Sequence, residues 1–494
     1  MKNNLLVLLI LTLGYTNVNF TYNGNFSHFY AVRNSNNKVL DIPFRMLELH
    51  STLQMNNFEI KTLLSSEYHH RTDDYFNTKD INHEIRELYG IYYFNSGEIS
   101  FGKKLFTLGS VDENSPIDHF NPYNYYYLLM GGTDKKIGIN SLSFELYLGD
   151  SYKISAALSP EHNTNHYPEN DPEYSLSLPV QPELYEFLDN KGSTHESFLS
   201  IQKSNNNSDF TLTYLRAFDR VFSLSGFTMY EFNGNNTFAA YTLDTWFSHR
   251  LTEAVNLGTI LLFNDITVRA DFSRFHSFDR YTRDDYLLLK STIDVLSGFN
   301  DFTELYDQMD IDGDGNPDLF NAALQENIKY NQFTLQIELP LPRDWKVNMQ
   351  YFQHDLVDYS INNYTFSDLT IQLPLVEIDL NNVINDEGDF FIPGLGSSMA
   401  TLTKKSVLFG IEKYMLSNNL KMTLTSFFDL DKGDGKLSSV ELEYEISDNL
   451  NIIFGSTNIT GDANVQSVSN FDLGYTFNLM EDFSHNRIQL NYYF

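Results

Sequence analysis

The chain has 494 residues with 33 Lys+Arg against 65 Asp+Glu, so its formal net charge is -32. Because nucleic-acid binding depends largely on Lys and Arg that displace counterions from phosphates, this charge excludes a nucleic-acid partner. Aromatic residues make up 15% of the chain, more than a disordered segment carries, and the absence of Cys excludes disulfides, thiolate metal sites and Cys-linked lipid anchors.

The first twenty residues have the pattern of a secretory signal peptide. Lys2 precedes the apolar stretch Leu5–Leu13, which only Thr12 interrupts. A membrane-spanning helix takes roughly 20 apolar residues, so this stretch is too short to span a bilayer, and the alternative is a buried helix at the N-terminus. We therefore expect a signal peptide over 1–20, cleaved between Gly14 and Thr21, and an exported mature protein over 21–494.

Three short motifs lie between Ile85 and Pro122. Two predicted strands and the loop after them carry the following residues: Arg86, Glu87 and Tyr89; Gly102, Lys103 and Lys104; Asp118, Asn121 and Pro122. With these residues the segment resembles the outer-membrane barrels of the alginate-export type, which have an Arg-Glu-x-Tyr strand, a Gly-Arg-Gln strand and an Asp-x-x-Asn-Pro loop. Lys103 and Lys104 stand where that family has Arg and Gln. The resemblance implies a substrate-conducting pore, monomeric in the best-known members.

The same segment suits the wall and the entrance of a pore. Arg86 and Glu87 are neighbours on a strand, so we expect them to face opposite sides, with only one of them in the lumen. The alternative for Arg86 is a structural pairing with a neighbouring carboxylate. Asn121-Pro122 begins a turn, because Pro fixes φ and lacks an N–H group, and we expect this loop to fold inward as a constriction.

The commonest pattern along the rest of the chain is a period of two, the pattern of β-strands. Apolar and polar residues alternate in six segments, which are 142–148, 333–339, 345–352, 440–446, 471–479 and 488–494. The link 340–344, with two Pro and an Asp, predicts a hairpin turn between two of these strands. The one short helix that we expect lies over 319–328. The chain is therefore predicted to be all-β.

An acidic loop over 310–318 has the spacing of a calcium site. Gly315 occupies position 6 of such a loop, and carboxylates occupy positions 1, 3, 5 and 9, which are Asp310, Asp312, Asp314 and Asp318. Asn321 stands at position 12, where a full site has Glu. We predict one weakly bound Ca²⁺, and the alternative is an acidic solvated turn. A second acidic cluster, over 429–434, has irregular spacing and is interpreted as a turn between strands.

Long strands rich in Tyr and Phe, joined by long segments rich in Asn and Asp, favour a closed antiparallel transmembrane β-barrel over a soluble sandwich or propeller. At about 10 residues per strand, 21–494 accommodates roughly 16 to 18 strands with long loops. Tyr492 and Phe494 resemble the membrane-insertion signal of bacterial outer-membrane barrels. We expect the chain in that membrane, with its lipid and lipopolysaccharide and the barrel-assembly machinery as partners. The alternative is a secreted β-rich protein.

Carboxylates lie on the polar faces of the predicted strands, which a barrel presents to its lumen: Glu145, Glu338, Glu441, Glu443, Glu445 and Asp472. Rings of carboxylates favour cations, so we predict a porin-like channel that conducts a small solute and prefers cations. Alginate is a polyanion and would need a basic cluster, for which Arg86, Lys103 and Lys104 are candidates.

Two alternatives to this channel remain open. The carboxylates could simply solvate the lumen without selecting a solute, or the barrel could be closed and act as a surface adhesin or assembly component. We expect no enzymatic activity, because the sequence contains neither a Gly-x-Ser-x-Gly nor a His-Glu-x-x-His motif.

Overall fold

Eighteen strands of the computed structural model close into one antiparallel barrel. The structure describes residues 18–70, 79–128, 130, 134–168, 187–188, 194–232, 240–281, 319–361, 364–365, 370–373, 376–379, 391–465 and 475–494. The barrel strands are, in chain order, β1 (Val18–Arg33), β2 (Phe44–Met55), β3 (Phe58–His70), β4 (Lys79–Phe94), β5 (Gly97–Lys104), β6 (Ile139–Leu148), β7 (Tyr152–Ser159), β8 (Glu196–Asn205), β9 (Ser208–Phe218), β12 (Leu251–Phe263), β13 (Ile266–Phe278), β15 (Glu326–Leu341), β16 (Trp345–Ile361), β20 (Lys405–Met415), β21 (Leu420–Asp429), β22 (Lys436–Ser447), β23 (Leu450–Thr460) and β24 (His485–Tyr493). The predicted fold class and the upper value of the predicted strand number are confirmed.

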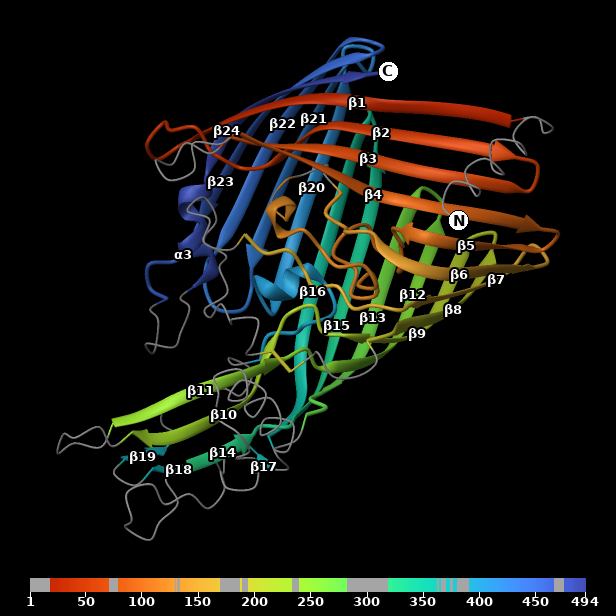
Figure 1. Cartoon of the computed structure of the whole chain (residues 1–494). Coiled ribbons are helices and arrows are strands. Elements are labelled where there is room, and N and C mark those ends of the chain that lie inside the picture. The colour runs from red at the N-terminus through yellow and green to blue at the C-terminus, as the bar shows by residue number, and fades with distance from the viewer. Residues whose placement is uncertain are drawn as a thin grey trace.

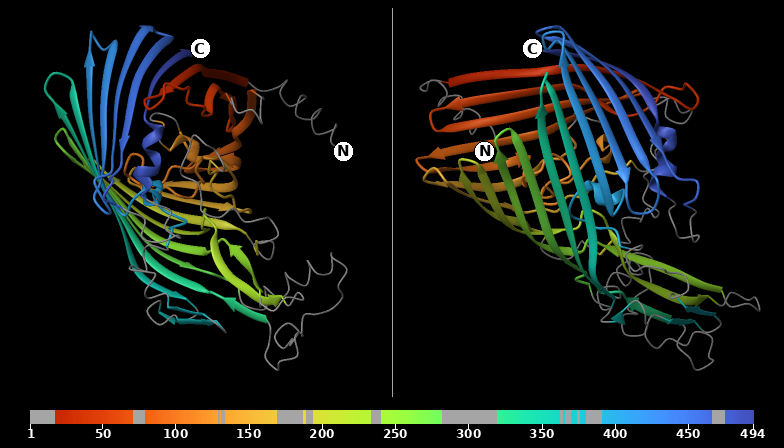
Figure 2. Two further views of the ribbon diagram at one scale, coloured as in Figure 1. Left: turned by 90° about the vertical axis from the view of Figure 1, so that its left-hand side faces the viewer. Right: turned by 180° about the vertical axis from the view of Figure 1, so that it is seen from behind.

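Each barrel strand pairs with the next barrel strand along the chain, and β1 pairs with β24 to complete the circle (Figures 1 and 2). Three other strands form a separate sheet beyond one end of the barrel: β10 (Ser223–Phe232), β11 (Ala240–Ser248) and β14 (Leu319–Ala323). Short β17 (Tyr364–Thr365) pairs with β16, and β18 (Thr370–Leu373) pairs with β19 (Val376–Asp379). Closure leaves no barrel strand with an unpaired edge, which is what a hydrocarbon environment requires.

Short turns join the strands at one end of the barrel, and long segments join them at the other. Two-residue turns link β2 to β3 and β12 to β13, where Asn56 and Asn264 adopt positive φ values of 50° and 53°, a conformation that Asn tolerates better than most residues. The predicted hairpin turn within 340–344 is confirmed between β15 and β16. In outer-membrane barrels the short turns are periplasmic and the long loops are extracellular. The short-turn end of this barrel is therefore called the periplasmic end, and the other end is called the extracellular end.

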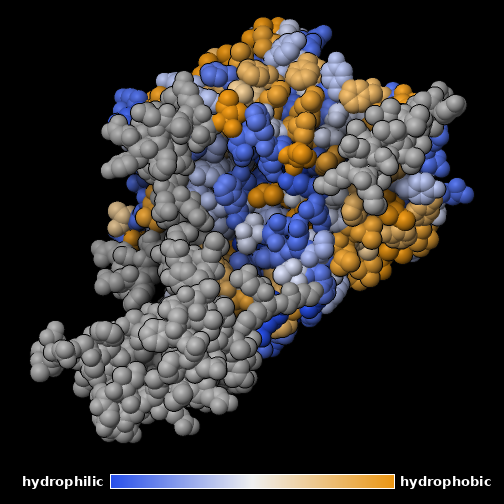
Figure 3. Space-filling model, in the orientation of Figure 1, coloured by the Kyte–Doolittle hydropathy of each residue, from blue (hydrophilic) through white to orange (hydrophobic). Residues whose placement is uncertain are grey.

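The barrel wall has an apolar outer face and a polar inner face. On β22, Val440, Leu442 and Tyr444 are about 40% exposed, whereas Glu441 and Glu443 between them are half-buried. Hydrophilic side chains gather around the hollow at the centre of the face shown in Figure 3, and hydrophobic side chains gather along the strands beside it. An exposed apolar wall on a closed barrel matches a lipid environment. The predicted location in the bacterial outer membrane is thus supported by the fold itself.

The helix expected over 319–328 is absent, so that prediction is wrong. Its residues form β14 and the start of β15. Leu319 to Ala323 pair with β10, and Asn327 and Ile328 pair with β13. Pairing partners that are distant in the sequence therefore override the local helical pattern.

The strand expected over 471–479 is also wrong where the structure describes it, from Tyr475 onward. There the chain forms α3 (Thr476–Met480) and the 3₁₀ turn η7 (Glu481–Phe483). Tyr475, Phe477, Met480 and Phe483 are buried in a hydrophobic cluster with inward-facing residues of β1, β21 and β23. Helical turns bring all four side chains to this cluster, whereas a strand would send Met480 to the opposite face from Phe477. Other helical elements are the 3₁₀ turns η1 (Tyr125–Tyr127) and η6 (Ser398–Thr401).

The last strand closes the barrel at the short-turn end. Phe494 exchanges two backbone hydrogen bonds with Gly24 of β1, each at 3.0 Å. Tyr492 and Phe494 are exposed on the outer face, and their rings stack with centroids 6.5 Å apart. Among the described residues, no helix is long and apolar enough to cross a membrane.

Candidate functional site

The segment 105–138, called the inner loop below, connects β5 to β6, and its described residues (105–128, 130 and 134–138) fold back inside the barrel (Figures 1 and 2). Asp271, on the inner face of β13, accepts hydrogen bonds from the N–H groups of Ser110 and Val111 at 2.8 and 3.0 Å and from Ser115 Oγ at 2.6 Å. A buried carboxylate that accepts several hydrogen bonds is a strong anchor. The predicted inward fold of this loop is confirmed.

Two glutamines of the neighbouring strands hold the next residues of the inner loop. Gln336 of β15 accepts a hydrogen bond from the Asp112 N–H group at 3.0 Å. Gln350 of β16 accepts one from Asn114 Nδ2 at 2.8 Å. The tip of the loop is therefore bound to three adjacent strands by side chains that project into the lumen.

Asn121 and Pro122, predicted from the family motif, close the inner loop on itself. Asn121 Oδ1 accepts a hydrogen bond from the Phe106 N–H group at 2.7 Å, and its Nδ2 donates to the Ile137 carbonyl at 2.8 Å. The Pro122 carbonyl accepts from the Ile137 N–H group at 2.8 Å. These contacts join the two ends of the loop, so the motif residues determine the loop's shape.

Asp118 has the same structural role. It accepts a hydrogen bond from the Leu108 N–H group at 3.0 Å and forms an ion pair with Lys136 Nζ at 2.6 Å. Burial raises the pKa of the Asp118 carboxyl, and the Lys136 ammonium opposes that rise. Burial also lowers the pKa of the adjacent His119 to about 3, so His119 is neutral at physiological pH.

Arg86 and Glu87 both face the lumen, so the prediction that they face opposite sides is wrong. Glu87 pairs with Leu63 and Ile85 with Leu64, which leaves Arg86 as the extra residue of a β-bulge. Glu87 accepts a hydrogen bond from the Leu105 N–H group at 2.8 Å, at the start of the inner loop. A bulge is determined by the partner strand, and the sequence of one strand does not reveal it.

Arg86 ties the other end of the inner loop to the wall. Its guanidinium is 3.0 Å from Glu48 of β2 and 2.7 Å from Asp134, and Arg45 donates to the Asp134 carbonyl at 2.5 Å. The Arg45 guanidinium also lies 4.5 Å from the centre of the Tyr127 ring. The structural pairing considered for Arg86 is the one observed.

The remaining motif residues lie on β4 and β5. Gly102 has φ of +132°, and a Cβ there would lie 2.3 Å from the Leu88 carbonyl oxygen, so only Gly fits. Lys104 Nζ lies 5.4 Å from the centre of the Tyr89 ring, and Lys103 pairs with Glu84 at 3.2 Å. These lysines are therefore dispersed over local partners, and they do not form the basic cluster that a polyanion would need.

Two buried arginine clusters at the extracellular end were not predicted. Arg220 forms a bidentate pair with Glu196, with both distances 2.8 Å, and donates to the Phe120 carbonyl of the inner loop at 2.7 Å. Arg250 is 2.9 Å from Asp219 and 3.1 Å from Glu326. The pairs join residues 24, 31 and 76 positions apart. Spacing within the sequence gives no signal for such contacts.

A second segment, 391–404, also enters the barrel and packs against the inner loop. Gly396 has φ of +117°, and the Ser397 N–H group donates to Gln332 of β15 at 2.8 Å. Lys135 of the inner loop donates to Ser398 Oγ at 3.1 Å. Between the two segments lies a cavity of about 10 Å³, room for about one water molecule.

The inner loop contacts hydrophobic clusters on two sides of the lumen. Phe106 and Phe120 pack with residues of β6 to β16, and Tyr126 and Tyr127 pack with residues of β1, β2 and β21 to β23. The loop therefore extends across the lumen from one wall to another, so any pathway passes beside it.

Five of the six predicted lumen carboxylates lie in the described strands, and all five lie on the polar side of the wall. Three have basic partners: Glu145 pairs with Lys153 at 2.5 Å, Glu338 with Arg269 at 3.2 Å and Lys346 at 3.0 Å, and Glu441 with Arg487. Glu443 accepts from Asn451 Nδ2. Within the described ranges neither Glu443 nor Glu445 lies in an ion pair. Asp472 lies outside the described residues.

The predicted calcium loop, with Asp310, Asp312, Asp314 and Asp318, lies outside the described residues. Across the part of the chain that the structure does describe, no three His, Asp or Glu side chains are grouped as a metal site. The acidic cluster over 429–434 is a turn between β21 and β22, as interpreted. Asp429 accepts hydrogen bonds from the Asp431 N–H group at 3.0 Å and Tyr475 Oη at 2.6 Å.

Neither family models nor curated proteins match the chain. Solved structures that resemble it include OccAB2 of Acinetobacter baumannii, with a TM-score of 0.44, 10% identity and coverage of 96% of this chain and 98% of that one. OccK5 (OpdH) of Pseudomonas aeruginosa has a TM-score of 0.47, 10% identity and the same coverage. OmpF of Salmonella typhi, in complex with daunomycin, has a TM-score of 0.40, 8% identity and coverage of 96% and 97%. None of these comparisons names an alginate-export family. Because these similarities are low, the assignment of a closed barrel depends on the strand pairing within this chain.

Proposed function

We propose that the chain is a porin-like channel that conducts a small solute across the outer membrane. The observation that carries the proposal is the inner loop, which is anchored to the wall by polar side chains at Asp271, Gln336 and Gln350. A channel that selects small solutes combines a polar wall with a constriction of its lumen. The inner faces of the strands supply the polar wall, and the inner loop supplies the constriction.

Single-channel recording in planar lipid bilayers tests this proposal. The purified chain should give discrete conductance steps. The competing function is a closed barrel that presents its loops as an adhesin or assembly component. The bridging of the two hydrophobic clusters by the inner loop favours that alternative, and a wild-type barrel without openings would support it.

We further propose that the channel prefers cations and does not carry a polyanion. Pairing with basic residues neutralises Glu145, Glu338 and Glu441, so the preference would rest on the acidic residues without such partners. Within the predicted set these are Glu443 and Glu445, which lie near the periplasmic mouth because they precede the short turn after β22. Their unneutralised charge would raise the local concentration of cations.

Replacing Glu443 and Glu445 by Gln should lower the cation-to-anion permeability ratio by about twofold or more. The reversal potential in a KCl gradient measures this ratio. The matched control is Asp265→Asn/Asp448→Asn, which removes the same charge from exposed short turns at the same end. Equal changes in both variants would show that the two glutamates act only through the net charge.

A further inference from the structure

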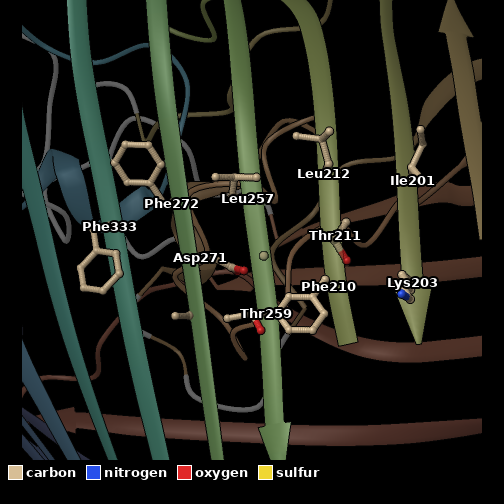
Figure 4. Close-up of a pocket in the computed structure, with 12 residues that line it drawn as sticks. Ile201, Lys203, Phe210, Thr211, Leu212, Leu257, Thr259, Asp271, Phe272 and Phe333 are labelled. Atoms are coloured by element: carbon tan, nitrogen blue, oxygen red, sulfur yellow. The ribbon is translucent and has the colours of Figure 1, made fainter. Parts of the chain in front are cut away.

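A hollow lies on the outer wall across β8, β9, β12, β13 and β15 (Figure 4). Its volume is about 510 Å³. Apolar side chains line most of it, including Phe210, Leu212, Leu257, Phe272 and Phe333. Asp271, drawn in the same figure, points away from it toward the lumen, where it holds the inner loop. The hollow, called the wall groove below, therefore faces lipid and is separate from the pore.

The wall groove results from small residues on neighbouring strands. Thr259 of β12 pairs directly with Ala270 of β13. On the next level of the wall, Leu257 pairs with Leu212 on one side and with Phe272 on the other. The two small side chains, Thr259 and Ala270, thus lie between Phe210 and Leu335 and beside a row of large side chains, and the volume that they leave unfilled is the groove. A surface of this shape accommodates a flexible chain better than a flat wall does.

Apart from Thr211, which shares its strand face with the buried Thr213, and Asp271, two polar groups line the groove. The Thr259 hydroxyl is buried, and among the described residues it has no hydrogen-bond partner. A buried hydroxyl without a partner is destabilising. Lys203 lines the groove from β8, two residues before the short turn that follows Asn205, and its ammonium lies 5.6 Å from the centre of the Tyr152 ring. The groove therefore has a cation at its periplasmic end and an unsatisfied donor further in.

We propose that the wall groove binds one phospholipid of the periplasmic leaflet. An acyl chain fills the apolar part, the phosphate lies beside Lys203, and an ester carbonyl accepts the hydrogen bond of Thr259. Basic side chains at the membrane interface bind lipid head groups in this way. The apolar wall of a second copy would supply neither an anion for Lys203 nor an acceptor for Thr259. This inference requires that the barrel lies in the outer membrane, but it does not require that the barrel conducts a solute.

Native mass spectrometry of the purified full chain, titrated with dioleoyl phosphatidylglycerol in detergent, tests the proposal. The wild type should retain one lipid at concentrations where further lipids dissociate. Lys203→Gln should weaken this binding roughly two- to fivefold, the range for an exposed charge pair. Thr259→Val should weaken it about threefold, since it removes one hydrogen bond. Dioleoylglycerol, which lacks the phosphate, should bind more weakly than the phospholipid and be insensitive to Lys203→Gln.

Filling the groove is the strongest test. Ala270→Leu should reduce binding of the tightly held lipid about tenfold or more, because the added side chain occupies its space. The matched control is Ala156→Leu, the same change on the outer face of β7 and outside the groove. Equal lipid retention in both variants would mean nonspecific surface lipid and would overturn the proposal. So would a loss of oligomers in Ala270→Leu with lipid binding unchanged, which would assign the groove to contact between copies.

Discussion

Removal of Tyr492, Tyr493 and Phe494 is expected to abolish assembly of the barrel in the membrane. These residues complete the contact of β24 with both neighbours. Phe494 exchanges two backbone hydrogen bonds with Gly24, and the Tyr493 N–H group donates to the Asn449 carbonyl at 2.8 Å. Without them the barrel has an open edge at its periplasmic end, and lipid offers no hydrogen bonds to replace the lost ones. Heat-modifiable migration in gels and protease resistance in membranes measure the outcome.

A matched pair of variants separates the side chains from the backbone. Tyr492→Ala/Phe494→Ala keeps every backbone pairing and removes only the two outward rings, which are exposed. If the rings are the insertion signal, this variant should fail to assemble as the truncation does. If backbone closure alone matters, it should assemble. Normal assembly of the truncated chain would contradict the predicted role of this strand.

Alternation along single strands was enough to predict the barrel and the faces of most strands. On β22, Val440, Leu442 and Tyr444 are exposed on the outer face, and Glu441 and Glu443 lie on the opposite one. This information is local, because a residue's side of a strand follows from its position parity. The prediction fails at Arg86, where a bulge set by β3 changes the parity.

The candidate site was only partly predictable, since it depends on contacts between distant segments. Asn121 and Asp118 were found from a motif, but their partners at Phe106 and Leu108 became known only from the structure. Asp271 lies 161 residues from Ser110. Nothing in its own strand distinguishes it from a carboxylate that simply faces water. Its role follows from the loop that it holds.

The free energy of the hydrogen bonds that hold the inner loop indicates which side chains must be removed to loosen it. Asp271 accepts hydrogen bonds from Ser110, Val111 and Ser115, and Gln336 holds Asp112. A hydrogen bond to a carboxylate contributes about 1.5–3 kcal/mol, and one between neutral groups such as that of Gln336 about 0.5–1.5 kcal/mol. Removal of both wall side chains should therefore loosen this part of the loop, which Gln350 still holds at Asn114. The strand pairing does not depend on either side chain, so the barrel itself should remain closed.

Asp271→Ala/Gln336→Ala is accordingly expected to raise single-channel conductance at least about twofold and to increase current noise, because a loosened loop restricts the lumen less and moves more. The matched control is Ser200→Ala/Thr213→Ala, which removes two inner-wall side chains that bond to each other at 2.8 Å. That control should conduct like the wild type. A silent wild type with a conducting Asp271→Ala/Gln336→Ala variant would identify the inner loop as the closure of a non-conducting barrel. Equal conductance in the wild type and this variant would show that the loop does not limit the flow of ions.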